Sequence, residues 1–185
     1  FIVLEGDEYL SSPMDRRPKF HLYQPNIALI SGIAWDHINV FPTYENYVEQ
    51  FEIFIKMITN GGILVYNEDD SEVKRVAEAA SNPIRKLPYS TPKYSVKEGV
   101  TLLETPEGAM PIEVFGAHNL NNLAGAKWIC QNMGVDEADF YEAIASFKGA
   151  SKRLEKIAES KTKVAYKDFA HSPSKVAATT KAVKE

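Results

Sequence analysis

An alternation of strand-length apolar runs with amphipathic helical segments constrains the fold of this chain more than any other feature. Apolar residues recur with helical spacing over 44–58, and Asn60-Gly61-Gly62 supplies a helix stop. Runs typical of buried strands lie on either side, at 27–30 and 62–66, and a polar amphipathic helix is predicted over 70–80. This order favours a parallel sheet covered by helices.

Short strand-like pieces separated by Pro and Gly follow, and no helix intervenes. They lie at 84–87, 93–96, 100–104 and 111–115. Such pieces predict antiparallel hairpins at one edge of the sheet. Helices are predicted again over 119–133 and 136–147, and residues 1–4 form a further apolar run of strand length. The expected fold class is α/β, with a mainly parallel sheet flanked by helices and a small antiparallel β portion.

The segment 148–152 has the composition of a linker, and a new strand (163–169) and a new helix (172–184) are predicted after it. We therefore expect a first domain over 1–148 and the start of a second domain over 149–185. The chain begins in an apolar run without a charged leader and stops inside a helical pattern, so we expect it to be part of a longer polypeptide.

Composition narrows the classes of function. The chain has 185 residues, 44% of them hydrophobic, and a formal net charge of -4, with Lys and Arg spread along the sequence. These values predict a sizeable core and argue against a protein that binds nucleic acid or a membrane surface. The single cysteine, Cys130, excludes an internal disulfide and a multi-cysteine metal cage, and indicates a reducing, cytoplasmic compartment. Oligomeric state is not indicated.

The segment 116–126 opens an apolar, Ala-rich helix with an imidazole and side-chain amides, and so predicts a small-molecule site. Asn119 and Asn122 are three residues apart and share one helix face, with His118 beside them. Each carboxamide can donate and accept hydrogen bonds, as the edge of a purine base requires. The structural alternative is a helix N-cap, which would explain Asn119 alone.

Acidic and imidazole side chains follow the first two predicted strands. Glu5-Gly6-Asp7-Glu8 follows the run at 1–4, and Trp35-Asp36-His37 follows the run at 27–30. In a parallel sheet both clusters would lie beyond the carboxyl edge, where ligands bind in open α/β folds. Carboxylate plus imidazole suits Mg²⁺, which keeps water and phosphate oxygens as its other ligands. The alternative is that these are solvated turn residues and a loop histidine.

Two further polar clusters are weaker signals. Arg153 follows the predicted linker, and Asp168 and His171 lie at the strand-to-helix turn of the second domain. A guanidinium can bind phosphates, and an aspartate can bind ribose hydroxyls. Surface arginines and aspartates at helix starts are common, so each cluster alone also fits a structural role.

In their order along the chain, these clusters resemble the Mur ligase family, the ATP-dependent amide-forming ligases of peptidoglycan assembly. The matching segments are EGDEY (5–9), DH (36–37), GAHNLNN (116–122), FKGASKRLE (147–155) and DFAHSP (168–173). The resemblance covers nearly the whole chain. It implies the central, ATP-binding domain of that family, followed by the first β-α of a Rossmann-like C-terminal ligase domain.

The resemblance also implies roles and ligands. Glu5 and His37 would bind Mg²⁺, with Glu8 a further metal ligand, and His118, Asn119 and Asn122 would line the adenine of ATP. Arg153 would contact the ATP phosphates, Asp168 would bind the ribose or phosphate side, and His171 would lie near the incoming amine. Glu5, His37, Arg153 and His171 would thus serve catalysis, with ATP and Mg²⁺ as cofactors.

Within the family, 1–20 and 35–43 look most similar to the branch that joins cell-wall tripeptide to UDP-N-acetylmuramate, and next to the L-alanine-adding branch. The implied reaction activates a carboxylate as an acyl phosphate, which an amino acid or peptide amine attacks. The Gly-Lys-Thr/Ser phosphate loop is absent, so we expect the chain alone to be inactive. A folylpolyglutamate-synthase-like ligase and a non-catalytic nucleotide-binding module remain alternatives.

Overall fold

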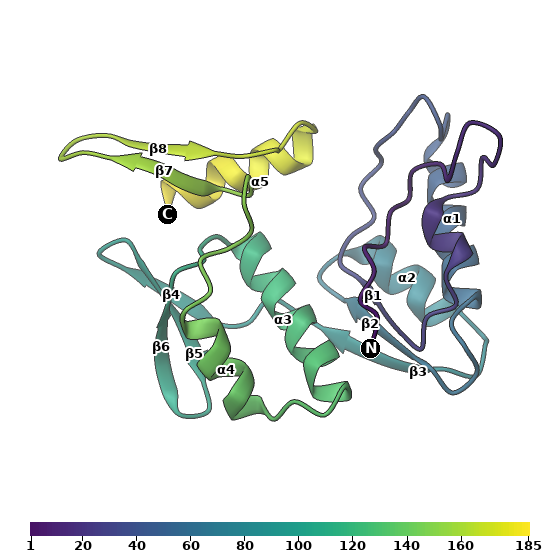
Figure 1. The fold of residues 1–185 in the computed structure, drawn as a ribbon, viewed down its shortest axis with the longest axis horizontal. Coiled ribbons are helices and arrows are strands. Elements are labelled where there is room, and N and C mark those ends of the chain that lie inside the picture. The colour runs from purple at the N-terminus through teal and green to yellow at the C-terminus, as the bar shows by residue number, and fades with distance from the viewer. The chain divides into compact units, whose positions relative to one another are not determined.

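A computed structural model describes all residues from 1 to 185, and the chain divides into two compact units. The first unit is Phe1–Ser90 and the second is Thr91–Glu185. Figure 1 shows the elements of both units along the chain. The predicted domain boundary between 148 and 149 falls inside the second unit and stays a prediction.

A three-stranded parallel sheet forms the centre of the first unit. Its order is β1-β2-β3, with β1 (Ile27–Ile30), β2 (Ile63–Asn67) and β3 (Arg85–Tyr89). The central strand β2 is buried over four of its five residues, which is why its sequence reads as a continuous apolar run. The predicted strand 84–87 is therefore present, but it joins the parallel sheet and does not form an antiparallel hairpin.

Two capped helices and a short 3-10 helix cover this sheet. Thr43 caps α1 (Tyr44–Lys56), Asp70 caps α2 (Ser71–Ala79), and η1 is Lys19–Leu22. Apolar side chains from all these elements form one core, which includes Phe20, Ile30, Ile33, Phe41, Tyr47, Phe51, Phe54, Ile55, Leu64, Tyr66, Val73 and Val76. The helical spacing over 44–58 thus predicted both the helix and its buried face correctly.

An antiparallel sheet with two helices begins the second unit. Its order is β4-β5-β6, with β4 (Tyr94–Lys97), β5 (Val100–Thr105) and β6 (Gly108–Ile112). Helices α3 (Ala117–Asn132) and α4 (Glu137–Ala145) pack against it around Leu103, Ile112, Val114, Leu120, Leu123 and Phe140. The hairpins predicted from the Pro- and Gly-rich segment are confirmed here.

A hairpin and a helix complete the second unit. Strands β7 (Glu155–Glu159) and β8 (Val164–Lys167) pair antiparallel, and α5 (Pro173–Lys184) follows. Helix α5 contacts α3 where a Cβ atom placed on Gly116 would lie 2.4 Å from Cβ of Ala182. Glycine is therefore required at the start of α3 for this close approach.

Two sequence predictions are corrected. Residues 1–4 form no strand and are exposed, because an apolar run without a pairing partner has no ladder to join. Strand β7 was not predicted, because its residues are polar and mostly exposed and carry no alternation. No helix in the chain combines the length and the apolar character needed to cross a membrane.

Candidate functional site

The loop after β1 presents His37 at the carboxyl end of the parallel sheet. His37 has a φ of 56°, a left-handed conformation that is uncommon for a residue with a Cβ atom. Its carbonyl accepts from the backbone N–H groups of Val40 and Phe41 at 2.8 and 3.0 Å, and its own N–H donates to Asp36 Oδ1 at 2.9 Å. The imidazole is thus held on a closed turn in a conformation that costs about 1 kcal/mol or more.

A carboxylate and an aromatic ring lie against this imidazole. Oε1 of Glu8 is 3.4 Å from Nε2 of His37, with side chains 25% and 30% exposed. The ring of Tyr9 lies 4.9 Å from the His37 ring, and Asn39 Nδ2 donates to the Tyr9 hydroxyl at 3.2 Å. Two segments that are almost 30 residues apart therefore converge, as the sequence predicted, although no strand precedes Glu8.

The segment 7–9 is not part of a strand, and backbone hydrogen bonds with η1 hold it in position instead. The N–H of Phe20 donates to the Asp7 carbonyl at 3.1 Å, and the N–H of Lys19 donates to the Tyr9 carbonyl at 3.0 Å. Phe20 is 2% exposed and packs against Phe51 and Phe54, so it fixes this pairing to the core. The acidic segment is thereby anchored by the residues that follow it.

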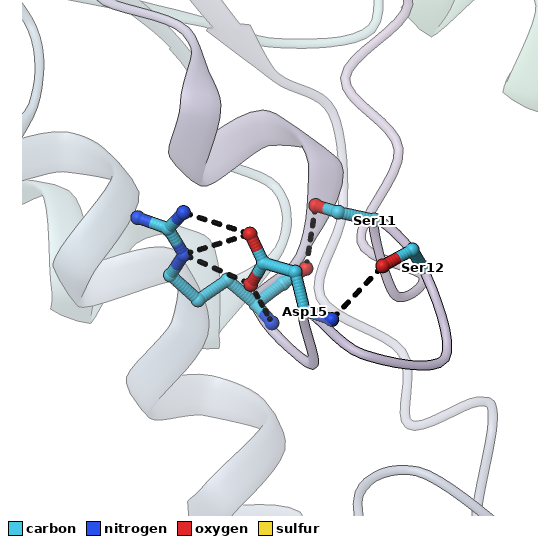
Figure 2. A network of polar contacts seen from close by, with 4 residues as sticks. Ser11, Ser12 and Asp15 are labelled. Atoms are coloured by element: carbon cyan, nitrogen blue, oxygen red, sulfur yellow. Dashed lines mark hydrogen bonds and ion pairs between the residues drawn. The ribbon is translucent and has the colours of Figure 1, made fainter.

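A closed turn over 11–17 brings η1 back beside the acidic segment. Figure 2 shows Ser11, Ser12 and Asp15 on this turn, with their hydrogen bonds as dashed lines. The Ser11 hydroxyl donates to the Arg17 carbonyl at 2.8 Å, and Ser12 Oγ accepts from the Asp15 N–H at 2.9 Å. The Arg17 guanidinium binds the Asp15 carboxylate, and this pair lowers the pKa of Asp15 to about 2.

Charged and buried groups around Glu8 shape the electrostatics of this region. Burial tends to raise the pKa of Asp7, but hydrogen bonds from Lys19 and the Tyr9 N–H outweigh it, so the pKa is lowered. Burial raises the pKa of Tyr47, and the carboxylates of Glu8 and Asp36 raise it further. Tyr47 is 3% exposed, so its phenol stays neutral and can donate to Glu8.

The pair of Glu8 and His37 fits Mg²⁺ by its spacing. Two ligands of an octahedral Mg²⁺ at right angles lie about 3 Å apart, close to the separation of Glu8 Oε1 and His37 Nε2. The chain holds no group of three or more His, Cys, Asp or Glu side chains arranged around a metal position. Glu8 and His37 therefore fit a site that takes its other ligands from water and phosphate. The Glu5 side chain is exposed, and its role as a metal ligand stays a prediction.

The second predicted site lies at the start of α3. Gly116, with a φ of 84°, is the N-cap residue, and no side chain caps the helix. The alternative that Asn119 is the N-cap is therefore wrong: it lies inside the helix, and its Nδ2 donates to the Phe115 carbonyl at 2.9 Å. Asn119 and His118 are partly exposed and Asn122 is exposed, so all three can reach a ligand.

Asn121, which the sequence did not single out, has a structural role. It is 8% exposed, and its Nδ2 donates to Thr91 Oγ1 at 3.1 Å. It lies on a different side of α3 from the exposed Asn122. Asn121 shares a helix face with Ala124 and Gly125, three and four residues further along, and both of these are buried.

The remaining predicted residues gather at the turn between β8 and α5. Oδ1 of Asp168 accepts from the Leu154 N–H at 3.0 Å, which brings the start of β7 to this turn. The Arg153 guanidinium lies 5.4 Å from the centre of the Phe169 ring, and the His171 ring lies 5.1 Å from the same ring. Arg153, Asp168 and His171 thus share one exposed surface.

The carboxylate of Asp168, on this turn, interacts electrostatically with His118 on α3. Burial lowers the pKa of His118, and the carboxylates of Asp168 and Glu185 oppose this shift without cancelling it. The His118 imidazole is therefore neutral at pH 7, with one donor and one acceptor nitrogen. Near it, Phe115 and Tyr166 pack ring to ring with centres 5.6 Å apart.

Comparison with known proteins gives one family. The model of the Mur ligase middle domain matches residues 8–130. The chain is 28% identical over 197 residues to the UDP-N-acetylmuramate–L-alanyl-gamma-D-glutamyl-meso-2,6-diaminoheptandioate ligase of Escherichia coli, and the match covers all of this chain and 42% of that protein. It is 27% identical to the UDP-N-acetylmuramate–L-alanine ligase of Caldicellulosiruptor bescii, again over the whole chain and 42% of the relative.

The fold agrees with solved structures. The structure of MurF from Acinetobacter baumannii matches with a TM-score of 0.72 and 19% identity, over 86% of this chain and 37% of that one. At this identity the match shows the fold alone. The α/β fold class expected from the sequence is confirmed, and the chain spans about two fifths of the length of the two curated relatives.

Proposed function

The chain belongs to the Mur ligase family through its middle domain, and we propose that the protein carrying it is an ATP-dependent ligase of peptidoglycan precursors. In this proposal it joins the carboxylate of a UDP-N-acetylmuramate substrate to an amine. The pair of Glu8 and His37 at the end of β1 carries the proposal, because a strained imidazole beside a carboxylate suits a metal–nucleotide site.

The proposed reaction has two steps, activation of the carboxylate and attack by the amine. A carboxylate oxygen attacks the γ-phosphorus of ATP, which gives an acyl phosphate and ADP. The amine nitrogen then attacks the acyl carbon, the C–O bond to phosphate breaks, and the amine loses a proton. Bound Mg²⁺ would stabilise the charge on the transferred phosphoryl group, and the protein would position the reactants.

The proposal assigns roles to both sets of residues. Glu8 and His37 bind the metal, as their 3.4 Å separation allows, and Glu5 is a candidate for a further ligand. His118, Asn119 and Asn122 bind the adenine. Asn119 uses Nδ2 for the bond to the Phe115 carbonyl, and its Oδ1 suits the exocyclic amino group of the base.

Arg153 and Asp168 bind the phosphate and ribose portions of ATP, and His171 lies near the incoming amine. The shared surface around Phe169 supports this part of the proposal. The substrates are ATP and UDP-N-acetylmuramate, and the reaction belongs to the cytoplasm, in keeping with a single unpaired cysteine.

The two named relatives leave two candidates for the amine, the tripeptide L-alanyl-gamma-D-glutamyl-meso-2,6-diaminoheptandioate and L-alanine. The test is to incubate the full-length protein that carries this chain with ATP, Mg²⁺, UDP-N-acetylmuramate and each amine, and to measure phosphate release and product mass. We expect phosphate release that requires both UDP-N-acetylmuramate and one of the amines. Phosphate release that is independent of UDP-N-acetylmuramate, or none with either amine, would contradict the proposal.

A further inference from the structure

Two side chains, one at the end of β2 and one at the N-cap of α2, hold the backbone that leads from β1 to His37. Asn67, the last residue of β2, donates from Nδ2 to the Ser31 carbonyl at 2.9 Å. Two residues further along the loop, the Ile33 N–H donates to Oδ2 of Asp70 at 3.1 Å. The loop is therefore tied to the neighbouring strand and helix at two successive points.

Asp70 uses its two oxygens for two different elements. Oδ1 accepts from the N–H groups of Glu72 and Val73, both at 3.0 Å, and so caps α2. Oδ2 accepts from Ile33. A cap alone needs only one oxygen, and serine would provide it. The second oxygen is what an aspartate adds at this position.

The rest of the loop also has little freedom to move, so the hydrogen bond from Ile33 to Asp70 constrains the position of the imidazole. Ile33 is 5% exposed and belongs to the core, so its backbone has little room to shift. Trp35 Nε1 donates to the Phe41 carbonyl at 3.0 Å, which closes the loop around the His37 turn. Only three residues separate Ile33 from His37, and the loop is held at both ends.

We propose that Asp70, supported by Asn67, is a positioning residue that holds His37 beside Glu8 and Tyr9. What His37 binds rests on the proposed function, but where His37 lies does not. The bond from Ile33 to Asp70 fixes the start of the loop, and the strained turn then places the imidazole in contact with both partners.

The test uses Asp70→Ser in this chain, because serine keeps an N-cap oxygen but is too short to reach Ile33 as well. We expect the nuclear Overhauser effects between the Tyr9 and His37 rings to weaken at least about threefold, since these effects fall steeply with the distance between the protons. Mn²⁺ binding, followed by broadening of the His37 ring signals, should weaken about 10-fold or more, as when other residues that orient metal ligands are changed.

Thr43→Ala is the matched control. Thr43 caps α1 through a 3.2 Å bond from the Asn46 N–H, and no hydrogen bond joins it to the 31–41 loop. This variant should lower the melting temperature at least as much as Asp70→Ser and leave the Overhauser effects between Tyr9 and His37 intact. Asp70→Asn provides a second variant, since its amide can serve the cap or Ile33 with an oxygen but not both.

The outcomes separate the two claims. Intact Overhauser effects between Tyr9 and His37 in Asp70→Ser and Asp70→Asn overturn the positioning role, whatever happens to the metal. An equal weakening in Thr43→Ala also overturns it, because the effect is then one of general stability. A weakening confined to the Asp70 variants supports it. If Mn²⁺ fails to broaden the His37 signals of the unchanged chain, the metal site of the proposed function fails, while the Overhauser effects still decide the positioning role.

Discussion

His37 and Gly116 are two positions of positive φ that the chain accommodates in opposite ways. Both have a positive φ, 56° at His37 and 84° at Gly116. At Gly116 the residue fits the conformation, and the missing Cβ atom lets α5 approach α3. At His37 the residue opposes the conformation, and hydrogen bonds from the surrounding turn hold it there.

The difference separates a position where packing determines the residue type from one where the residue type is kept on a strained backbone. Where packing decides, the sequence uses the residue that the backbone prefers. At His37 the chain keeps an imidazole on a strained backbone, and hydrogen bonds from Asp36 and the neighbouring loop stabilise the turn. Glu98, in the turn between β4 and β5, also has a positive φ, so the functional argument at His37 depends on its contacts with Glu8 and Tyr9 and not on its backbone alone.

Gly116→Ala should give the largest effect. The new Cβ atom meets Ala182 at 2.4 Å and the backbone is left-handed, so we expect a loss of about 2–4 kcal/mol of unfolding free energy in the second unit. Denaturant unfolding measures this loss. Adding Ala182→Gly should recover the part due to the clash. No recovery would mean that α5 does not approach α3 as described.

Asn121→Ala tests the hydrogen bond that joins α3 to Thr91. Removing the amide breaks its bond to Thr91 Oγ1 in a partly buried position, and we expect a loss of about 1–3 kcal/mol of unfolding free energy. Asn122→Ala, one residue further and exposed, is the matched control and should change stability by less than about 0.5 kcal/mol. Equal losses in the two variants would contradict the orientation of α3.

His37→Gly tests the strain in the first unit. Glycine relieves the left-handed backbone but loses the partly exposed pairing with Glu8, so unfolding free energy should stay within about 1 kcal/mol of the unchanged chain. His37→Ala loses the same pairing and keeps the strain, and it should be less stable than His37→Gly by about 1 kcal/mol. The reverse order in thermal unfolding would show that the turn is unstrained.

His118 should give the smallest effect, a pH dependence. Its pKa is lowered from 6.5, chiefly by burial, so the unfolded chain binds the proton first as pH falls. The native state is therefore favoured above pH 6.5, and part of that stability is lost as pH falls through the lowered pKa. His118→Asn should show a smaller decline between about pH 7 and pH 5 in urea unfolding. If the unfolding free energy depends on pH equally in the variant and in the unchanged chain, the His118 imidazole is not buried.

The sequence predicted elements wherever one residue pattern dominated. The helical spacing over 44–58 and the buried run of β2 were unambiguous, because each describes a face that the core must cover. The strand at 1–4 was wrong, since an apolar run cannot reveal whether a partner strand exists. Pairing between β2 and β3 depends on the same long-range information.

In the candidate site, too, some contacts could be predicted from the sequence and others could not. The contact between Glu8 and His37 was expected because acids and an imidazole were predicted at the carboxyl edge of one sheet, although the strand expected before Glu8 is absent. The contacts of Tyr47 with Glu8 and of Asp70 with the loop after β1 were not predicted. Each of the two residues satisfied a local pattern, a helical core position and a helix cap, and only the fold shows their second contacts.

The ligase reaction is the decisive measurement for a metal–nucleotide site at the end of β1. Phosphate release from ATP is measured with UDP-N-acetylmuramate and the preferred amine in the full-length protein and in its variants His37→Ala, Asn119→Ala and, as an exposed control, Lys156→Ala. We expect no phosphate release by His37→Ala at any ATP concentration, a raised ATP requirement in Asn119→Ala, and unchanged turnover in Lys156→Ala. Turnover by His37→Ala equal to that of the unchanged protein would contradict a metal–nucleotide site at the end of β1.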